Sequence, residues 1–382
     1  MIFLEVKIDN FYMFKDTVVD LTYPKKNNSS TIEGEFLTDF PNIKYKKVCI
    51  FTGANASGKT ALAKMMCAIN NYLDGRNLRN DRIKLDDKIC DVKQSASFTI
   101  TYTTPETSSI HKLEAIFDEE GLMRERYQTQ KLRKSYSLKE TIESLDVKEI
   151  DFFYDRHKDN RGIENPKFQS VAAILGKMES DNFWNYSFDE YGYKHAVEST
   201  VDLTLLEKIM KTFDLSIKAI LPIKESETNS CIVKLSNGDE VIISHGEVQN
   251  TGRLSSGTLE SIKIASMIEN IIYSGKENGR GSTFFIDENM AHTHSEMEQS
   301  LLNLAIDKLG ENSQLFYTTH NYDILAMNLP THSYVFLKKD EFTQVIHPEK
   351  LGYTQNDRNL LSFVKNDVFA TLPDTSPIDD LL

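Results

Sequence analysis

The chain has 382 residues, 40% hydrophobic and 26% charged, a composition that excludes fibrous and intrinsically disordered proteins. Its formal net charge of −13, from 44 basic and 57 acidic side chains, argues against a generally basic surface for nucleic acid. No run approaches the ~20 apolar residues of a membrane-spanning helix, and the N-terminus alternates like a strand and lacks the pattern of a signal peptide. We expect a cytoplasmic protein of one large or two ordinary domains.

The N-terminal segment alternates apolar and polar residues over 2–8 and again over 18–23, which predicts a hairpin joined through residues 9–16. An apolar run, 48–52, then leads into Gly53-Ala-Asn-Ala-Ser-Gly-Lys-Thr60, which fits the phosphate-loop pattern G-x-x-x-x-G-K-[ST]. After it, apolar residues recur with the spacing of one helix face, and Gly75 is a candidate stop. Strand, loop and helix together are the context in which this pattern binds a nucleotide.

Each residue type in the loop has a physical reason. Gly53 and Gly58 let the backbone curl so that its N–H groups point at a phosphate, and the following helix adds its dipole. Lys59 supplies a positive charge for the β- and γ-phosphates, and Thr60 supplies a hydroxyl ligand for Mg²⁺. The other residues predicted to bind the nucleotide are Asn55, Ala56 and Ser57. The alternative, a chance glycine-rich turn, is disfavoured by the flanking strand and helix.

The region that follows carries structural signals but no clear chemistry. Alternation within 98–127 predicts a small antiparallel β layer, an apolar stripe over 206–213 predicts a helix, and 231–244 reads as a hairpin. Sustained heptads are missing, so no long coiled coil is expected. Cysteine spacing suggests no metal site, and we expect buried thiols at all four positions: Cys49, Cys67, Cys90 and Cys231.

Three short motifs lie between residues 253 and 320. Leu254-Ser-Ser-Gly-Thr258 precedes a helical stripe, so Ser255 or Ser256 can simply cap that helix. Two short apolar strands end in Asp287-Glu288 and in Thr318-Thr-His320. Such strands are typical of parallel sheets, which bind ligands at their carboxyl ends. Each motif alone could be a helix cap or a solvated strand end, but their order favours a shared site.

Adjacent carboxylates after a buried strand can divide the work of hydrolysis. Asp287 is a candidate Mg²⁺ ligand, and Glu288 can accept a proton from the attacking water. In order along the chain, these motifs resemble the Walker A, signature, Walker B and switch-histidine motifs of ABC-type ATPases. The opening Ile8-Asp-Asn-Phe-Tyr-Met-Phe-Lys-Asp16 and the later His294 resemble the SMC/RecF/OLD branch, especially bacterial AAA-annotated ATP-binding proteins of phage defence such as PARIS or Septu.

The resemblance implies an α/β fold with a P-loop core, an N-terminal antiparallel β layer and an inserted helical lobe. It implies a homodimer, or a higher homo-oligomer of such dimers, that sandwiches ATP and Mg²⁺, each phosphate loop facing the other subunit's signature at Ser255, Ser256 and Gly257. His320 would sense the γ-phosphate. The signature departs from the common Leu-Ser-Gly-Gly-Gln, and the glutamine loop is unassigned, with Gln94 and Gln128 as candidates. We expect slow hydrolysis, as suits a switch.

Domain boundaries follow from the motif positions. We expect a discontinuous ATPase core and an insertion, followed by a C-terminal extension with an acidic tail that either frays or docks a partner. The expected ranges are 1–75 with 250–350 for the core, 76–250 for the insertion and 351–382 for the extension.

Two functions compete. The first is an ATP-gated switch for a separate effector protein such as a nuclease, since too few residues follow the switch histidine for the nuclease domain of an OLD-type enzyme. The second is a DNA-maintenance ATPase that clamps a duplex, with Lys44, Lys46 and Lys47 or Lys131, Arg133 and Lys134 as a local phosphate-binding face. A solvated charged face is the alternative meaning of those basic runs.

A third function, a transporter motor, is disfavoured by the long separation between the phosphate loop and the signature.

Overall fold

The computed structural model describes most of the chain. The described residues are 1–24, 30–74, 85, 87–158, 167–178, 183–188, 202–223, 230–244, 247–276, 282–288, 290, 293–354 and 360–373. They divide into two compact units. The first unit contains residues 1–184, 279–285 and 311–382, and the second contains 185–278 and 286–310.

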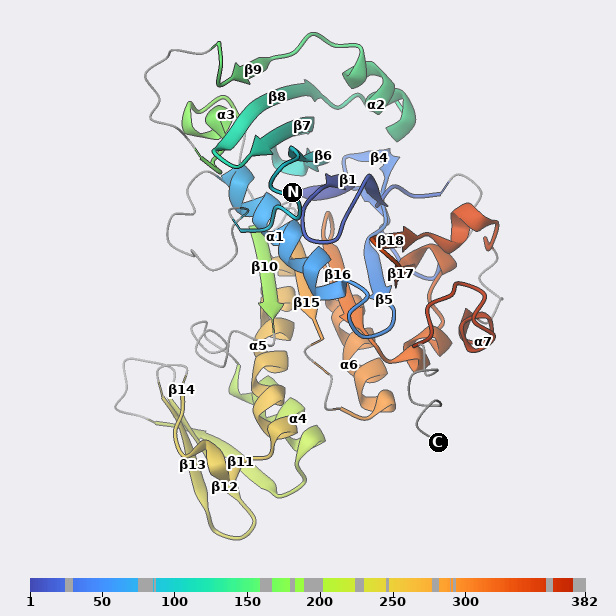
Figure 1. Cartoon of the computed structure of the whole chain (residues 1–382). Coiled ribbons are helices and arrows are strands. Elements are labelled where there is room, and N and C mark those ends of the chain that lie inside the picture. Colours follow the sequence, from blue (N-terminus) through green and yellow to red (C-terminus); the bar gives the residue numbers. More distant parts are fainter. Residues whose placement is uncertain are drawn as a thin grey trace. The chain divides into compact units, whose positions relative to one another are not determined.

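The first unit contains an antiparallel sheet in the order β2-β1-β6-β7-β8-β9 (Figure 1). The strands are β1 (Ile2–Asp9), β2 (Thr17–Asp20), β6 (Ala96–Thr104), β7 (Ser109–Asp118), β8 (Gly121–Lys131) and β9 (Phe152–Asp155). The predicted N-terminal hairpin and the predicted β layer are both confirmed. They belong to one sheet, because β1 pairs with β6 along nearly its whole length.

The strands of the β layer share a sheet with β1 and lie in the unit that holds the phosphate loop. The expected domain ranges, 1–75 with 250–350, 76–250 and 351–382, stay a prediction. Strand pairing between segments about 100 residues apart leaves no local signal in the sequence.

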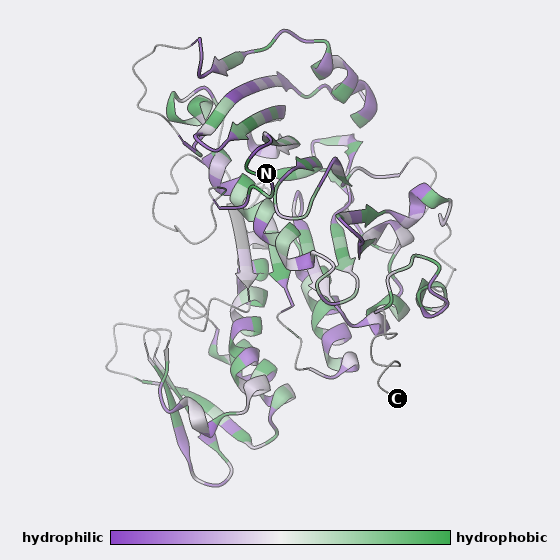
Figure 2. Cartoon of the chain, in the orientation of Figure 1, coloured by the Kyte–Doolittle hydropathy of each residue, from purple (hydrophilic) through white to green (hydrophobic). Residues whose placement is uncertain are grey.

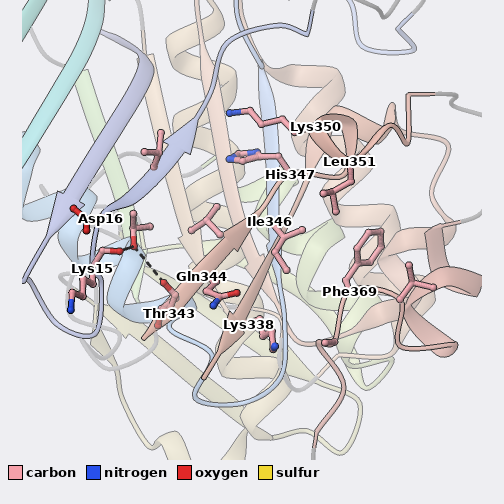
Figure 3. A pocket seen from close by; sticks show the side chains of 15 residues that line it. Lys15, Asp16, Lys338, Thr343, Gln344, Ile346, His347, Lys350, Leu351 and Phe369 are labelled. Atoms are coloured by element: carbon pink, nitrogen blue, oxygen red, sulfur yellow. Dashed lines mark hydrogen bonds between the residues drawn. The ribbon is translucent and has the colours of Figure 1, made fainter. Parts of the chain in front are cut away.

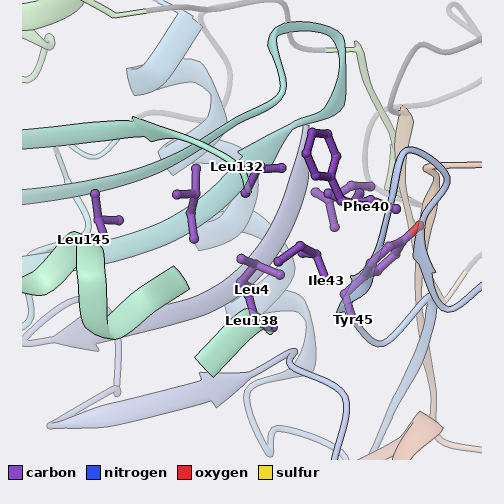
Figure 4. Packing of buried hydrophobic residues seen from close by; sticks show 10 residues of the cluster. Leu4, Phe40, Ile43, Tyr45, Leu132, Leu138 and Leu145 are labelled. Carbon is purple, nitrogen blue, oxygen red and sulfur yellow. The ribbon is translucent and has the colours of Figure 1, made fainter. Parts of the chain in front are cut away.

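One face of this sheet is covered by α2 (Leu138–Asp146), whose N-cap Ser137 forms a capping box with Glu140. Leu138 and Leu145 of α2 pack into a buried cluster with Leu4 and Ile43 (Figure 4). Ile43 comes from β4 (Phe40–Lys44), which pairs with β3 (Phe36–Leu37). This cluster ties the N-terminal strand to a helix more than a hundred residues later in the chain.

A second sheet has the order β10-β15-β16-β5-β17-β18. Its strands are β5 (Val48–Thr52), β10 (Phe183–Phe188), β15 (Ser282–Asp287), β16 (Gln314–Thr319), β17 (Tyr334–Lys339) and β18 (Thr343–Ile346). Strand β5 pairs in parallel with β16, as the apolar runs predict, and it also pairs in parallel with β17. Every residue of β5 is buried, and the strand is coloured hydrophobic in Figure 2. Phe51, Phe285 and Phe316 pack their rings together at this centre, with centroids 5.7–6.1 Å apart.

Helix α1 (Lys59–Asp74) follows β5 and buries the predicted apolar stripe. The first unit also holds α3 (Val171–Ile174) and α7 (Leu360–Lys365). Short 3-10 turns include η5 (Tyr322–Ala326), η6 (Thr331–Ser333) and η7 (Pro348–Leu351). Three of the cysteines are buried as expected, but Cys90 is exposed, because it lies on a loop outside both sheets.

The second unit is built on α4 (Leu203–Phe213), α5 (Ser256–Lys276) and α6 (Ser295–Lys308). Helix α4 packs on α5 and on β11 (Ile217–Pro222). The predicted hairpin is confirmed as β12 (Cys231–Leu235) and β13 (Glu240–Ser244), with β14 (Glu247–Val248) at the edge. Throughout the described ranges of both units, no helix has the length and apolar character needed to span a membrane.

Candidate nucleotide-binding site

The predicted phosphate loop forms the turn between β5 and α1. Thr52 ends the strand and Lys59 begins the helix, so the loop leads directly into a helix N-terminus. Ala56 and Gly58 have φ angles of 61° and 103°, in the left-handed region. Alternating left-handed residues in a short loop turn successive N–H groups toward one concave side, which is the geometry that binds an anion.

Both glycines of the motif are required by packing. A Cβ atom on Gly53 would lie 2.3 Å from the carbonyl oxygen of Leu337 in β17. A Cβ on Gly58 would lie 2.7 Å from the hydroxyl oxygen of Thr343 in β18. Backbone and side-chain atoms of β17 and β18 therefore back the loop at the two positions where the motif specifies glycine.

Lys59 is buried and lies across its own loop. Its Nζ donates to the carbonyl oxygens of Gly53 at 2.9 Å and Ala54 at 3.1 Å. These bonds hold the ammonium group at the loop, where it can meet the charge of a bound phosphate.

The neighbouring side chains differ in exposure. Asn55 and Ala56 are exposed, Thr60 is half-buried at the second position of α1, and Ser57 is buried. The hydroxyl of Ser57 has no hydrogen-bond partner within the described part of the chain.

The switch-histidine candidate lies at the same sheet edge as the loop. In the parallel pairing of β16 with β5, Thr319 is the partner of Thr52. His320 and Gly53 are the next residues on the two strands, so both leave the sheet at the same level. His320 is exposed. The structure thus brings His320 and the phosphate loop together within the first unit.

The Walker B candidates lie at the end of β15. Asp287 is the last residue of the strand and is 4% exposed. Glu288 is half-buried and has a φ angle of 49°, a left-handed conformation that costs a non-glycine residue energy. This left-handed conformation changes the direction in which the Glu288 side chain leaves the backbone, directly after the strand.

The signature candidate forms the start of α5 in the second unit. Ser255 caps the helix, because its Oγ accepts a hydrogen bond from the N–H of Thr258 at 3.1 Å. The Thr258 hydroxyl in turn donates to Asp214 at 3.3 Å and is fully buried. Ser255 and Ser256 are exposed and Gly257 is half-buried. The capping interpretation of Ser255 is confirmed, and its hydroxyl remains at the surface of a helix N-terminus.

Comparison with solved structures shows which known fold this architecture resembles. An SMC head domain in complex with the C-winged-helix domain of ScpA is 13% identical, covers 92% of this chain and 99% of that chain, and has a TM-score of 0.50. The chain has the fold of an SMC head domain. The predicted α/β fold with an antiparallel β layer is therefore confirmed as that of an SMC head domain, and the described residues contain no long coiled coil.

Two further structures have lower scores. The SMC head domain from Thermotoga maritima is 9% identical, covers 91% of this chain and 99% of that chain, and has a TM-score of 0.42. The recombination mediator protein RecF with ATP is 15% identical, covers 90% of this chain and 99% of that chain, and has a TM-score of 0.39. No protein-family model and no curated protein matches the sequence.

Several side chains of this SMC-head fold differ from expectation. Lys46 and Lys47 were candidates for a surface that binds DNA, but both are buried. Lys46 donates to Glu349 at 2.6 Å, so its charge is neutralised inside the protein. The interpretation of this run as a surface is wrong for these two lysines, because a carboxylate far along the chain pairs with one of them.

The glutamine candidates both make local contacts. Gln128 donates to the carbonyl oxygens of Leu145, in the last turn of α2, and of Lys148, just beyond the helix, and Gln94 donates to Asp91. Neither contact involves the phosphate loop.

Sequence reasoning missed Leu337 and Thr343, the residues that back the loop. They lie in β17 and β18, almost three hundred residues after the motif. The sequence around them carries only an ordinary strand signal, so no local pattern could have identified them.

Proposed function

We propose that this chain binds ATP with Mg²⁺ and hydrolyses it, acting as an ABC-type ATPase. The observation that carries the proposal is the phosphate loop itself. Two glycines are enforced by packing, the loop opens into a helix N-terminus, and Lys59 lies on the loop carbonyls. A site of this design favours a polyphosphate over other anions, because backbone donors, helix dipole and ammonium group act on the same place.

The remaining roles follow from the donor atoms. The hydroxyl of Thr60 and the carboxylate of Asp287 are oxygen ligands of the kind that Mg²⁺ prefers, and the ion would neutralise charge on the phosphates. Glu288 would accept a proton from the attacking water, and His320 would contact the γ-phosphate. Asn55, Ala56 and Ser57 complete the loop around the nucleotide.

We further propose that two copies close around ATP. Ser255, Ser256 and Gly257 form a helix N-terminus with exposed hydroxyl groups, which suits the γ-phosphate of a nucleotide bound to the other copy. Because Thr258 is buried against Asp214, the contact would be limited to the three residues before it. ATP would shift the population toward the closed dimer to the extent that it binds that form more tightly.

In this proposal the dimer is a nucleotide-gated switch that holds or releases a separate effector, such as a nuclease, in bacterial anti-phage defence. The resemblance of the motifs to phage-defence ATPases supports this role, and the acidic net charge favours a protein partner over nucleic acid.

A pull-down tests the role. Tagged Glu288→Gln protein is recovered from its host with Mg-ATP, with and without nuclease treatment, and bound protein and nucleic acid are identified. A stoichiometric protein that survives nuclease treatment supports the switch. Recovery of DNA alone, with every protein lost after nuclease, would contradict it.

A second candidate, a DNA-maintenance ATPase, is favoured by one observation. Lys44, Arg133 and Lys134 are exposed, and Asn42 of β4 donates to the carbonyl oxygen of Lys134 at 2.9 Å, so the two basic runs are neighbours on the first unit. Salt-dependent duplex binding that an Arg133→Glu, Lys134→Glu variant loses, together with DNA-stimulated hydrolysis, would establish this function. Absence of both effects at low salt would eliminate it.

A further inference from the structure

We infer that Thr343 is a positioning residue for the phosphate loop: its hydroxyl sets the direction of the Gly58 N–H group and thereby the affinity for the β-phosphate. The inference rests on the proposed nucleotide binding and adds to it a residue from the opposite end of the chain.

The contact is direct and buried. The Oγ1 of Thr343 donates to the carbonyl oxygen of Ser57 at 3.3 Å, and Thr343 is 2% exposed. The peptide that joins Ser57 to Gly58 is planar and trans, so its C=O and N–H groups point in opposite directions. A donor that holds the Ser57 carbonyl on one side therefore turns the Gly58 N–H to the other side. In a phosphate loop, that N–H belongs to the set that binds the phosphate.

Thr343 is itself fixed by the segment between β1 and β2 and by the first residue of β2. Its N–H donates to the carbonyl oxygen of Met13 at 2.7 Å, and its carbonyl oxygen accepts from the hydroxyl of Thr17 at 3.4 Å. Thr343, Lys15 and Asp16 line a cavity of about 600 Å³, and Figure 3 shows these side chains. With its backbone held on both sides, the side chain has a defined place from which to support the loop.

The glycine at position 58 makes the arrangement specific. Gly58 has a φ angle of 103°, which a residue with a side chain rarely adopts, and its Cβ would lie 2.7 Å from Thr343 Oγ1 and 3.0 Å from Cγ2. Thr343 thus fills the space beside Gly58 with its methyl group and holds the preceding carbonyl with its hydroxyl. Rotation of the whole peptide plane between Ser57 and Gly58 would break the hydrogen bond from Thr343 to the Ser57 carbonyl oxygen.

Two substitutions distinguish the effect of the Thr343 hydroxyl group from the effect of the side-chain shape. Thr343→Val keeps the branched shape and removes the donor, whereas Thr343→Ser keeps the donor. One neutral hydrogen bond corresponds to about a three- to tenfold change in affinity. We expect Thr343→Val to weaken ATP and ADP binding by about that factor, and Thr343→Ser to stay within about twofold of the wild type.

The matched control is Thr103→Val. Thr103 is a fully buried threonine of β6 whose hydroxyl has no hydrogen-bond partner in the described part of the structure. Its replacement removes a buried hydroxyl without removing a hydrogen bond, so nucleotide affinity should not change.

The measurements are equilibrium binding of ATP and ADP and steady-state ATP hydrolysis by the full chain. Positioning of the loop predicts a raised KM for ATP with kcat changed less than about twofold, whereas general loss of structure would reduce the active fraction and lower kcat. Wild-type affinity in Thr343→Val, an equal loss in Thr343→Ser, or an equal loss in Thr103→Val would overturn the inference. A wild-type chain that binds no nucleotide would instead refute the proposed function.

Discussion

The hydroxyl of Tyr72, near the end of α1, donates a hydrogen bond to the carboxylate of Glu125 in β8. The other carboxylate oxygen accepts the N–H of Ala172 at 2.8 Å, at the start of α3. Glu125 is fully buried, and this burial raises the pKa of its carboxyl group from 4.5 to about 7, although its hydrogen bonds act in the opposite direction. The helix that follows the phosphate loop is therefore tied to the β layer through an acid that titrates near neutral pH.

This linkage predicts a stability that depends on pH. Because the pKa of Glu125 is higher in the folded state than in the unfolded state, the folded protein binds the proton more tightly. The contribution of Glu125 to the unfolding free energy is fully present below about pH 4.5, falls as the pH rises through about 7, and then levels off. A shift of this size corresponds to at most roughly 3 kcal/mol. Urea unfolding at a series of pH values between 5 and 8 measures it.

Glu125→Gln is the control for that measurement. Its amide can accept the Ala172 N–H and donate to the Tyr72 oxygen, so the packing survives while the titration is removed. We expect the difference in unfolding free energy between the variant and the wild type to increase in favour of the variant from pH 5 to pH 8. A constant difference would show that Glu125 does not titrate in this range.

Gly53 gives a second, purely steric prediction. The Cβ of Gly53→Ala would lie 2.3 Å from the backbone oxygen of Leu337, which cannot move aside without distorting β17. We expect a loss of about 1–3 kcal/mol in unfolding free energy and a strong loss of nucleotide binding. Gly252→Ala is the control, since its Cβ would meet nothing within 4 Å. Equal behaviour of the two variants in urea unfolding would contradict the steric argument.

The phosphate loop and its neighbours could be predicted because their signals are local. The apolar run before Gly53 and the helical stripe after Lys59 lie within about twenty residues of each other, and the observed β5 and α1 follow them closely. The strand that ends at Asp287 was predicted in the same way.

What could not be predicted depends on residues that are distant in sequence. Thr343 supports a loop 286 residues earlier, and Glu349 pairs with Lys46 across 303 residues. A run of lysines is interpreted as a solvated surface unless the carboxylate that pairs with it is known. That carboxylate comes close to the lysine only when the chain folds. The hydrophobic pattern determined the elements, but polar contacts between distant segments determined which charges are buried.

Lys46 provides a third prediction. Its ammonium group is 2.6 Å from Glu349, and both side chains are at most 5% exposed. Lys46→Met leaves the Glu349 carboxylate buried without its cation, which typically costs about 3–5 kcal/mol. Replacing both, as Lys46→Met with Glu349→Leu, should recover most of that loss in urea unfolding. If the double variant is no more stable than Lys46→Met alone, the broken Lys46–Glu349 ion pair is not the cause of the lost stability.

Lys59 and Lys64 lie on the same helix and allow a matched test of the nucleotide site. Lys59→Ala removes the ammonium group that lies on the loop carbonyls, so ATP affinity should fall at least about tenfold, the range of a charge-assisted hydrogen bond. Lys64→Ala, further along α1, should leave affinity unchanged. Both variants should retain the far-ultraviolet circular dichroism of the wild type. ATP binding by Lys59→Ala at wild-type strength would show that the loop is misassigned.

Glu288→Gln tests the proposed chemistry and the proposed dimer together. The amide has nearly the same shape and can occupy the same left-handed backbone position, but it cannot accept a proton from water. We expect ATP affinity within about threefold of the wild type and kcat reduced by about a hundredfold or more, the usual contribution of a general base. With turnover stopped, Mg-ATP should accumulate a dimer that light scattering detects and that ADP does not support. Glu296→Gln, an exposed carboxylate in the first turn of α6, is the control and should hydrolyse ATP normally. Normal turnover by Glu288→Gln would assign the base to another residue, and blocked turnover without a dimer would separate hydrolysis from closure.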